Sequence, residues 1–150
     1  MKNEKIKILA KFLGVKEGEI QEISFSESLF KKVGNQLFKV RNWEYLVLTE
    51  EEKEKKIKEY ITNNLWAFNT GFILSHTNIG LNPTTEKAMQ KMQKELHEDA
   101  NEIIKALIKN MDEFIENAVN ARGAGHFLDK YDGSEKELNG FYIYRIYRTN

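Results

Sequence analysis

The sequence predicts an α+β fold in which helices pack on a small antiparallel β-sheet. Two observations support this class. Residues 50–121 repeat apolar side chains at steps of three and four, which is typical of helices, while residues 29–49 and 126–148 carry short runs of aromatic and β-branched residues, which are typical of strands. The chain has 150 residues, a single proline and no linker-like segment, so we expect one domain over 1–150.

Composition excludes several classes of protein. The 23 basic and 23 acidic residues give a net charge of zero, so no global field attracts nucleic acid or an anionic membrane. Cysteine is absent, which excludes disulfides and zinc–thiolate sites. No apolar run approaches the roughly 18 residues of a membrane span, and no apolar leader follows Met1. We therefore expect a cytoplasmic protein.

Residues 1–24 predict a short helical pair. Apolar residues favour a helix over 4–13 that ends at Gly14, and residues 16–23 suggest a second helix. The pair resembles a helix-turn-helix, but Glu17, Glu19 and Glu22 in its second helix would repel phosphates. Two core-forming helices are the simpler interpretation.

Residues 29–49 predict a β-meander. Its strands are expected at 29–30, 37–40 and 45–48, with turns at Gly34-Asn35 and Arg41-Asn42. No acidic residue lies between 29 and 43, and the basic and aromatic side chains that could form one surface are Lys31, Lys32, Lys39, Arg41 and Trp43. Cations beside flat rings suit single-stranded nucleic acid or an acidic protein partner. A solvated strand face with its aromatic residues in the core is the alternative.

Residues 50–121 predict helices. Thr49 with Glu52 forms a capping box that begins the first, whose apolar stripe runs to Phe72. A loop over 75–83 precedes a helix capped by Thr84 or Thr85, with an apolar stripe from 89 to 118. An unbroken helix of that length would extend about 50 Å, so we expect a break near Asn110-Met111-Asp112.

Residues 126–148 form the most densely functionalised segment. We expect an extended run at 126–128, a turn at Asp132-Gly133 and a strand over 141–147. If that strand pairs with 45–48, the terminal segment and the basic meander form one surface. The candidate partner-binding residues are Arg122, His126, Tyr131, Asp132, Tyr142, Tyr144, Arg145 and Arg148.

Catalysis is an alternative use of the same segment. His126 with Asp129 or Asp132 could provide a general acid and base, which would suit a small hydrolase. No nucleophile elbow, phosphate-binding loop or zinc motif is present, and an EF-hand alignment fails at its first and last ligands, Leu128 and Asn139. We therefore expect no metal, no cofactor and no enzymatic activity.

A resemblance adds context. Phe12-Leu13-Gly14-Val15, the runs 44–51, 65–69 and 98–102, and the closing segment from Gly125-His126 through Tyr131-Asp132-Gly133 to Tyr144-Arg145 resemble a group of small uncharacterised proteins of bacteriophages and prophages. The resemblance spans most of the chain and implies no catalytic residues. It implies an accessory protein that binds a host protein or nucleoprotein complex.

The leading hypothesis is therefore a non-enzymatic inhibitor or modulator of a host macromolecule, similar in role to anti-CRISPR or anti-restriction proteins. A nucleic-acid-binding regulator that uses the basic meander is the second hypothesis, and the His126-centred hydrolase is the third.

Overall fold

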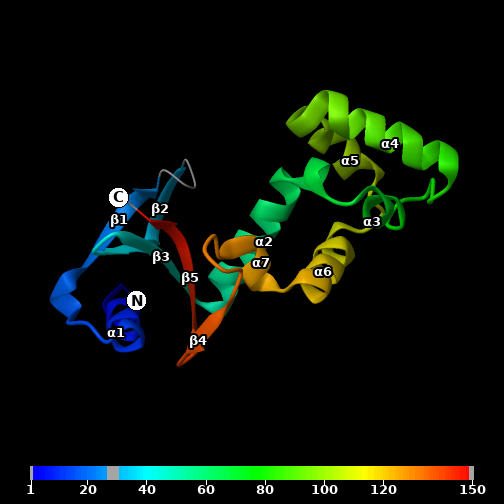
Figure 1. Cartoon of the computed structure of the whole chain (residues 1–150). Coiled ribbons are helices and arrows are strands. Elements are labelled where there is room, and N and C mark those ends of the chain that lie inside the picture. Colours follow the sequence, from blue (N-terminus) through cyan, green and yellow to red (C-terminus); the bar gives the residue numbers. More distant parts are fainter. Residues whose placement is uncertain (1, 27–30, 149–150) are drawn as a thin grey trace. The chain divides into compact units, whose positions relative to one another are not determined.

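The computed structural model describes residues 2–26 and 31–148, with the side chains at 2, 24–26, 31–35 and 147–148 outside that description. The α+β class is confirmed (Figure 1). The chain divides into two compact units, one formed by Met1–Lys56 with Arg122–Asn150 and the other by Ile57–Ala121.

The first unit is built on a five-stranded antiparallel sheet in the order β1-β2-β3-β5-β4. The strands are β1 (Ile20–Ser26), β2 (Lys31–Val40), β3 (Trp43–Leu48), β4 (Lys136–Leu138) and β5 (Phe141–Arg148). The last strand pairs with 45–48 of the meander, which the sequence left as a condition: Tyr45 faces Arg145 and Leu48 faces Tyr142. Strands far apart in the sequence are thus neighbours at the centre of the sheet.

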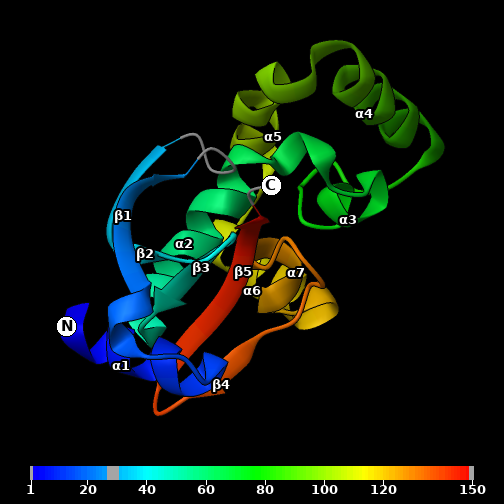
Figure 2. The same cartoon turned by 60° about the vertical axis from the view of Figure 1, so that its left-hand side comes forward.

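Helix α1 (Lys2–Leu13) covers one face of this sheet, as Figures 1 and 2 show. The helix expected over 4–13 is confirmed. Alternation along the strands directs Phe38 and Val40 of β2 and Tyr45 and Val47 of β3 into one cluster with the buried side of α1. Ile143 of β5 completes this cluster, so the face is apolar across three strands.

Three local predictions for this unit were wrong. Residues 16–23 form a 3₁₀ turn, η1 (Glu17–Glu19), and the start of β1, so there is no helix-turn-helix. Ile20 and Ile23 pair with β2, and this nonlocal pairing overrides the weak helical pattern. Gly34-Asn35 lies inside β2 rather than in a turn. Residues 126–128 belong to a short helix, α7 (Ala124–Leu128), instead of an extended run.

The turn at Arg41-Asn42 is confirmed, with Arg41 in the left-handed region at φ 55°. The first predicted strand, Leu29-Phe30, lies outside the described residues.

The second unit is helical. Its elements are the end of α2 (Glu50–Asn63), η2 (Leu65–Ala67), α3 (Thr70–Leu74), α4 (Pro83–Leu96), η3 (His97–Ala100), α5 (Asn101–Leu107) and the main part of α6 (Met111–Arg122). The expected break near 110–112 is confirmed, and Asn110 Oδ1 accepts from the Glu113 amide. A second break at η3 was not expected, and His97 there has φ 50°. Asn82, rather than Thr84 or Thr85, caps α4.

A buried ion pair joins α1 to the start of α2. Lys5 is fully buried, and its Nζ lies 2.6 Å from Glu52 Oε1. Glu52 also completes the predicted capping box, in which it accepts from the Thr49 amide and its own amide donates to Thr49 Oγ1. Burial acts to raise the pKa of the Glu52 carboxyl, but hydrogen bonds from Lys5, Thr49 and Gln36, with the charge of Lys5, lower it below its ordinary value.

We expect Glu52→Gln to lower the free energy of unfolding at pH 7 by about 3 kcal/mol, because it removes the carboxylate that pairs with the buried Lys5 ammonium at 2.6 Å. The lowered pKa means that the carboxylate stabilises the fold above its ordinary pKa of 4.5 and that this contribution is lost as the pH falls through the folded value. We therefore expect the difference in unfolding free energy between wild type and variant, measured by urea denaturation, to become smaller from pH 7 to pH 3. Exposed Glu51→Gln is the control, and an equal difference at every pH would contradict the account.

Helix α7 packs directly on the loop that follows it. A Cβ placed on Gly125 would lie 2.4 Å from the Gly133 carbonyl oxygen and 2.7 Å from the Ser134 carbonyl carbon. These neighbours are main-chain atoms, which cannot rotate away. Gly125 is therefore required for the loop over 129–134 to close against α7.

Gly125→Ala should destabilise the protein by about 2 kcal/mol, since the added methyl group forces two main-chain segments apart. Gly18→Ala is a matched control, because a Cβ at that position would meet nothing within 4 Å and its φ is ordinary. Thermal unfolding followed by circular dichroism gives both values. Equal melting temperatures for the two variants would show that the close approach at Gly125 is absent in solution.

Candidate functional site

Asp129 organises the loop between α7 and β4. Its side chain is 4% exposed, and Oδ1 accepts from the amides of Tyr131 and Asp132, both at 2.9 Å, and of Gly133 at 3.3 Å. Oδ2 accepts from the Arg145 amide at 2.9 Å. A buried carboxylate is stable only when its oxygens are hydrogen-bonded, and here main-chain donors satisfy both. The loop is therefore fixed to β5 by one side chain.

Asp129 and Lys130 also hydrogen-bond the part of the β5 main chain that β4 does not pair with. Strand β4 begins at Lys136, which pairs with Ile143, so the main chain of Arg145 lies beyond the end of the β4–β5 ladder. Its amide donates to Asp129, and its carbonyl accepts from the Lys130 amide at 2.7 Å. Residues 129–130 thus continue the edge that β4 begins and satisfy both main-chain groups of Arg145.

This arrangement brings four side chains together, which we call the Arg145 cluster: Trp43, Tyr131, Asp132 and Arg145. The Tyr131 and Trp43 rings meet edge to face, with centroids 5.0 Å apart and an interplanar angle of 88°. The Arg145 guanidinium carbon lies 4.2 Å from the Tyr131 centroid and 5.6 Å from the Trp43 centroid. Tyr131 remains 59% exposed, so the cluster presents an aromatic surface with a cation held against it.

Asp132 is the carboxylate of this cluster. Its Oδ1 accepts from Ser134 Oγ at 2.6 Å and from the Ser134 amide at 3.1 Å. Its Oδ2 lies 3.5 Å from Arg145 Nη2 and 3.9 Å from Lys136 Nζ. The Ser134 hydrogen bonds, supported by the charge of Lys136, lower the pKa of Asp132 to about 2, so the carboxylate is ionised at neutral pH.

Two of the predicted partner-binding residues belong to a different network. Tyr144 is fully buried, and its hydroxyl donates to Glu135, which also pairs with Lys53 at 3.1 Å. Burial, followed by the bond to Glu135, raises the pKa of Tyr144. The Tyr142 ring lies 3.9 Å from Lys53 Nζ, and the hydrogen bond to Glu50 raises the pKa of Tyr142. Tyr144 therefore supports the fold and is not available to a partner.

Arg122 and His126 lie apart from the Arg145 cluster in their described contacts. Both side chains are exposed, and the described contact of His126 is an edge-to-face approach to the Phe127 ring at 5.0 Å. Among the described residues, His126 forms no hydrogen bond with Asp129 or Asp132. Because Asp129 is committed to main-chain amides, the geometry offers no support for an acid–base pair centred on His126. The Arg148 side chain lies outside the described part.

The described side chains of the basic meander, Lys39, Arg41 and Trp43, do not form one surface. Phe38 is buried beneath α1, and Lys39 alternates with it, so Lys39 points to the opposite side of β2. Arg41 is exposed at the turn and pairs with Glu19 at 3.4 Å. Trp43 joins the Arg145 cluster instead. The side chains of Lys31 and Lys32 are outside the described residues.

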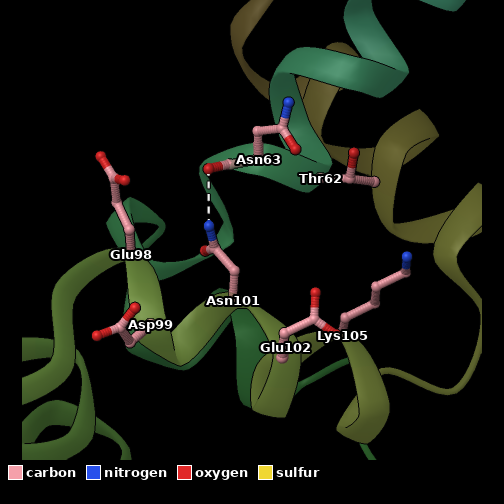
Figure 3. A pocket seen from close by; sticks show the side chains of 7 residues that line it. All are labelled: Thr62, Asn63, Glu98, Asp99, Asn101, Glu102 and Lys105. Atoms are coloured by element: carbon pink, nitrogen blue, oxygen red, sulfur yellow. Dashed lines mark hydrogen bonds between the residues drawn. The ribbon is translucent and has the colours of Figure 1, made fainter.

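The second unit contains an open polar hollow of about 430 Å³, which was not foreseen (Figure 3). Asn101 supports its floor by donating to the Asn63 carbonyl at 2.7 Å and accepting from the Trp66 amide at 2.9 Å. Figure 3 shows Glu98 and Asp99 pointing away from Lys105. The lining residues are Thr62, Asn63, Glu98, Asp99, Asn101, Glu102 and Lys105. Its carboxylates are exposed and solvated, so the hollow contains no preorganised set of ligands.

Neither a protein-family model, nor a curated protein, nor a solved structure matches the chain. Over the described residues, no group of three or more His, Asp or Glu side chains is placed to hold a metal ion. None of the helices described is both long and apolar enough to cross a membrane.

Tyr131, Asp132 and Arg145 were expected on one surface from the sequence, and the structure brings them together. Trp43 was expected on another surface, and Ser134 and Lys136 were missed. A signal for Ser134 was present, since an aspartate in a turn commonly accepts a hydrogen bond from the amide two residues later, which for Asp132 is that of Ser134. Lys136 follows Ser134 by two residues, so in an extended chain its side chain lies on the same side as that of Ser134.

Asp129→Ala should reduce the free energy of unfolding by about 3 kcal/mol, because it leaves several buried or half-buried amides without an acceptor. Exposed Glu137→Ala, on the neighbouring β4, is the control and should change stability by less than about 0.5 kcal/mol. Chemical denaturation monitored by fluorescence measures both. A neutral effect of Asp129→Ala would mean that the loop is not fixed by its carboxylate.

Proposed function

We propose that this chain is a non-enzymatic binding protein whose contact surface is centred on the Arg145 cluster. The observation that carries the proposal is the preorganised group formed by the exposed Tyr131 with the half-buried Trp43 and Arg145. These three residue types are the ones most enriched among residues that dominate binding energy at protein interfaces. Because the rings already hold the guanidinium, little side-chain freedom remains to be lost on association.

The proposed partner is a host protein or nucleoprotein complex in the bacterial cytoplasm, and a defence nuclease is the specific candidate. Support for this part comes from the resemblance to bacteriophage and prophage proteins. The role would be to inhibit or modulate the partner, as anti-CRISPR and anti-restriction proteins do. A binding role is also supported by the use of the two carboxylates considered for a His126-centred reaction, since main-chain amides occupy Asp129 and Ser134 occupies Asp132 Oδ1.

A nucleic-acid partner has less support from the geometry. Binding to a phosphate backbone needs several cations along one track. Lys39 and Trp43 belong to different sides of the sheet, and Arg41 is paired with Glu19. In the experiment below, capture that depends on nucleic acid is therefore the result that would favour this alternative.

The test is affinity capture from bacterial lysate with and without nuclease, followed by binding of the purified partner to variants. Tyr131→Ala and Arg145→Ala should each weaken binding by about thirtyfold, or about 2 kcal/mol, because they remove the exposed ring and the cation. Arg122→Ala is the matched control, since it is an exposed arginine that makes no described contact with the cluster, and its affinity should match the wild type. Circular dichroism confirms that each variant is folded.

Equal affinity for Arg122→Ala and Arg145→Ala would contradict the proposed surface. Recovery that disappears with nuclease would contradict the protein-partner proposal and favour a nucleic-acid role. Tyr144→Ala is unsuitable as a probe, since loss of binding in that variant would report damage to the core.

A further inference from the structure

The Arg145 guanidinium has more donor capacity than the protein uses. Its side chain is about one quarter exposed, at 27%, and it carries five N–H donors. Among the described residues its one acceptor is Asp132 Oδ2, which is 3.5 Å from Nη2, at the long limit of a hydrogen bond. Among the described residues, the rest of the guanidinium contacts the Tyr131 and Trp43 rings rather than hydrogen-bond acceptors.

Asp132 itself is held mainly by Ser134 rather than by the two cations. Its two bonds from Ser134 are short, whereas Arg145 and Lys136 approach its other oxygen at 3.5 and 3.9 Å. Lys136 also donates to Ser134 Oγ, which is a neutral acceptor. A carboxylate that binds an arginine well does so through two parallel bonds of about 2.8 Å. The cations thus face a carboxylate that neutralises them poorly.

We infer that Arg145 and Lys136 form an anchor site for a carboxylate of an acidic protein segment, and that Asp132 occupies this site as a weak internal competitor. This inference rests on the proposed binding function and names the chemistry of its partner. An incoming carboxylate takes the bidentate position on Arg145, while Asp132 keeps its bonds to Ser134. The Tyr131 ring lies beside the anchor and packs against the apolar part of the incoming segment.

A carboxylate fits this site better than a phosphodiester chain for two reasons. The site already accommodates a planar carboxylate beside the guanidinium. Among the described side chains, the cations that approach Asp132 Oδ2 are Arg145 and Lys136, and Arg41, at the turn before β3, is paired with Glu19. A strand of nucleic acid would find no continuing row of positive charge among the described residues.

The test compares binding of a capped tetraglutamate peptide to wild type and to Asp132→Asn, by nuclear magnetic resonance titration of the Arg145 and Lys136 side chains. The asparagine oxygen can still accept from Ser134, so the turn is retained, while the competing charge is removed. We expect about a tenfold gain in affinity, because like charge no longer opposes the peptide. The gain should disappear in the double variant Asp132→Asn with Arg145→Gln.

Asp99→Asn is the matched control, since it makes the same change in net charge at an exposed residue of the other unit, and its affinity should equal that of the wild type. Unchanged or weaker peptide binding by Asp132→Asn would overturn the inference. A larger gain for an oligothymidylate probe than for the peptide would also overturn it, in favour of nucleic acid. Partner capture by wild type and Arg145→Ala is measured separately, so failure of the anchor site is distinguishable from failure of the binding function.

Discussion

The carboxylate of Asp129 is the constraint on which the described surface depends. It replaces the water that would otherwise solvate the amides of the loop after α7, and it bonds the same loop to the Arg145 amide. A single buried side chain thereby decides where residues 129–134 lie on the sheet. Gly125 is needed to keep the loop in this position, since any side chain there would push the loop away from α7.

The position of the loop explains the chemistry of the surface. Fixing the Arg145 main chain leaves its side chain on the same side of β5 as Ile143, where Trp43 of the neighbouring strand meets it. Tyr131 reaches this point from the loop, and its ring centroid lies 4.2 Å from the guanidinium carbon. Strand β5 contributes Arg145, its neighbour β3 contributes Trp43, and the edge loop contributes Tyr131 and Asp132, so the cluster exists when the sheet and the loop are both formed.

Local patterns predicted much of the fold. The periodicity of α1, the capping box at Thr49 and the strand at 141–147 all follow from short-range chemistry, and their positions are confirmed. The prediction for residues 16–23 was wrong because pairing with β2, which no local pattern encodes, decides their conformation. The same limit applies to Asp129. From the sequence it was one of several carboxylates, and the tertiary contact with β5 is what buries it.

Amide hydrogen exchange is the most direct measurement of the central claim. The amides of Tyr131, Asp132 and Arg145 should exchange slowly, with protection approaching that of β3, because each donates to the buried Asp129 carboxylate. Exchange of these amides at the rate of an unstructured chain, while β3 stays protected, would contradict the account. It would show that the loop is not fixed to β5 and that the Arg145 cluster is not preorganised.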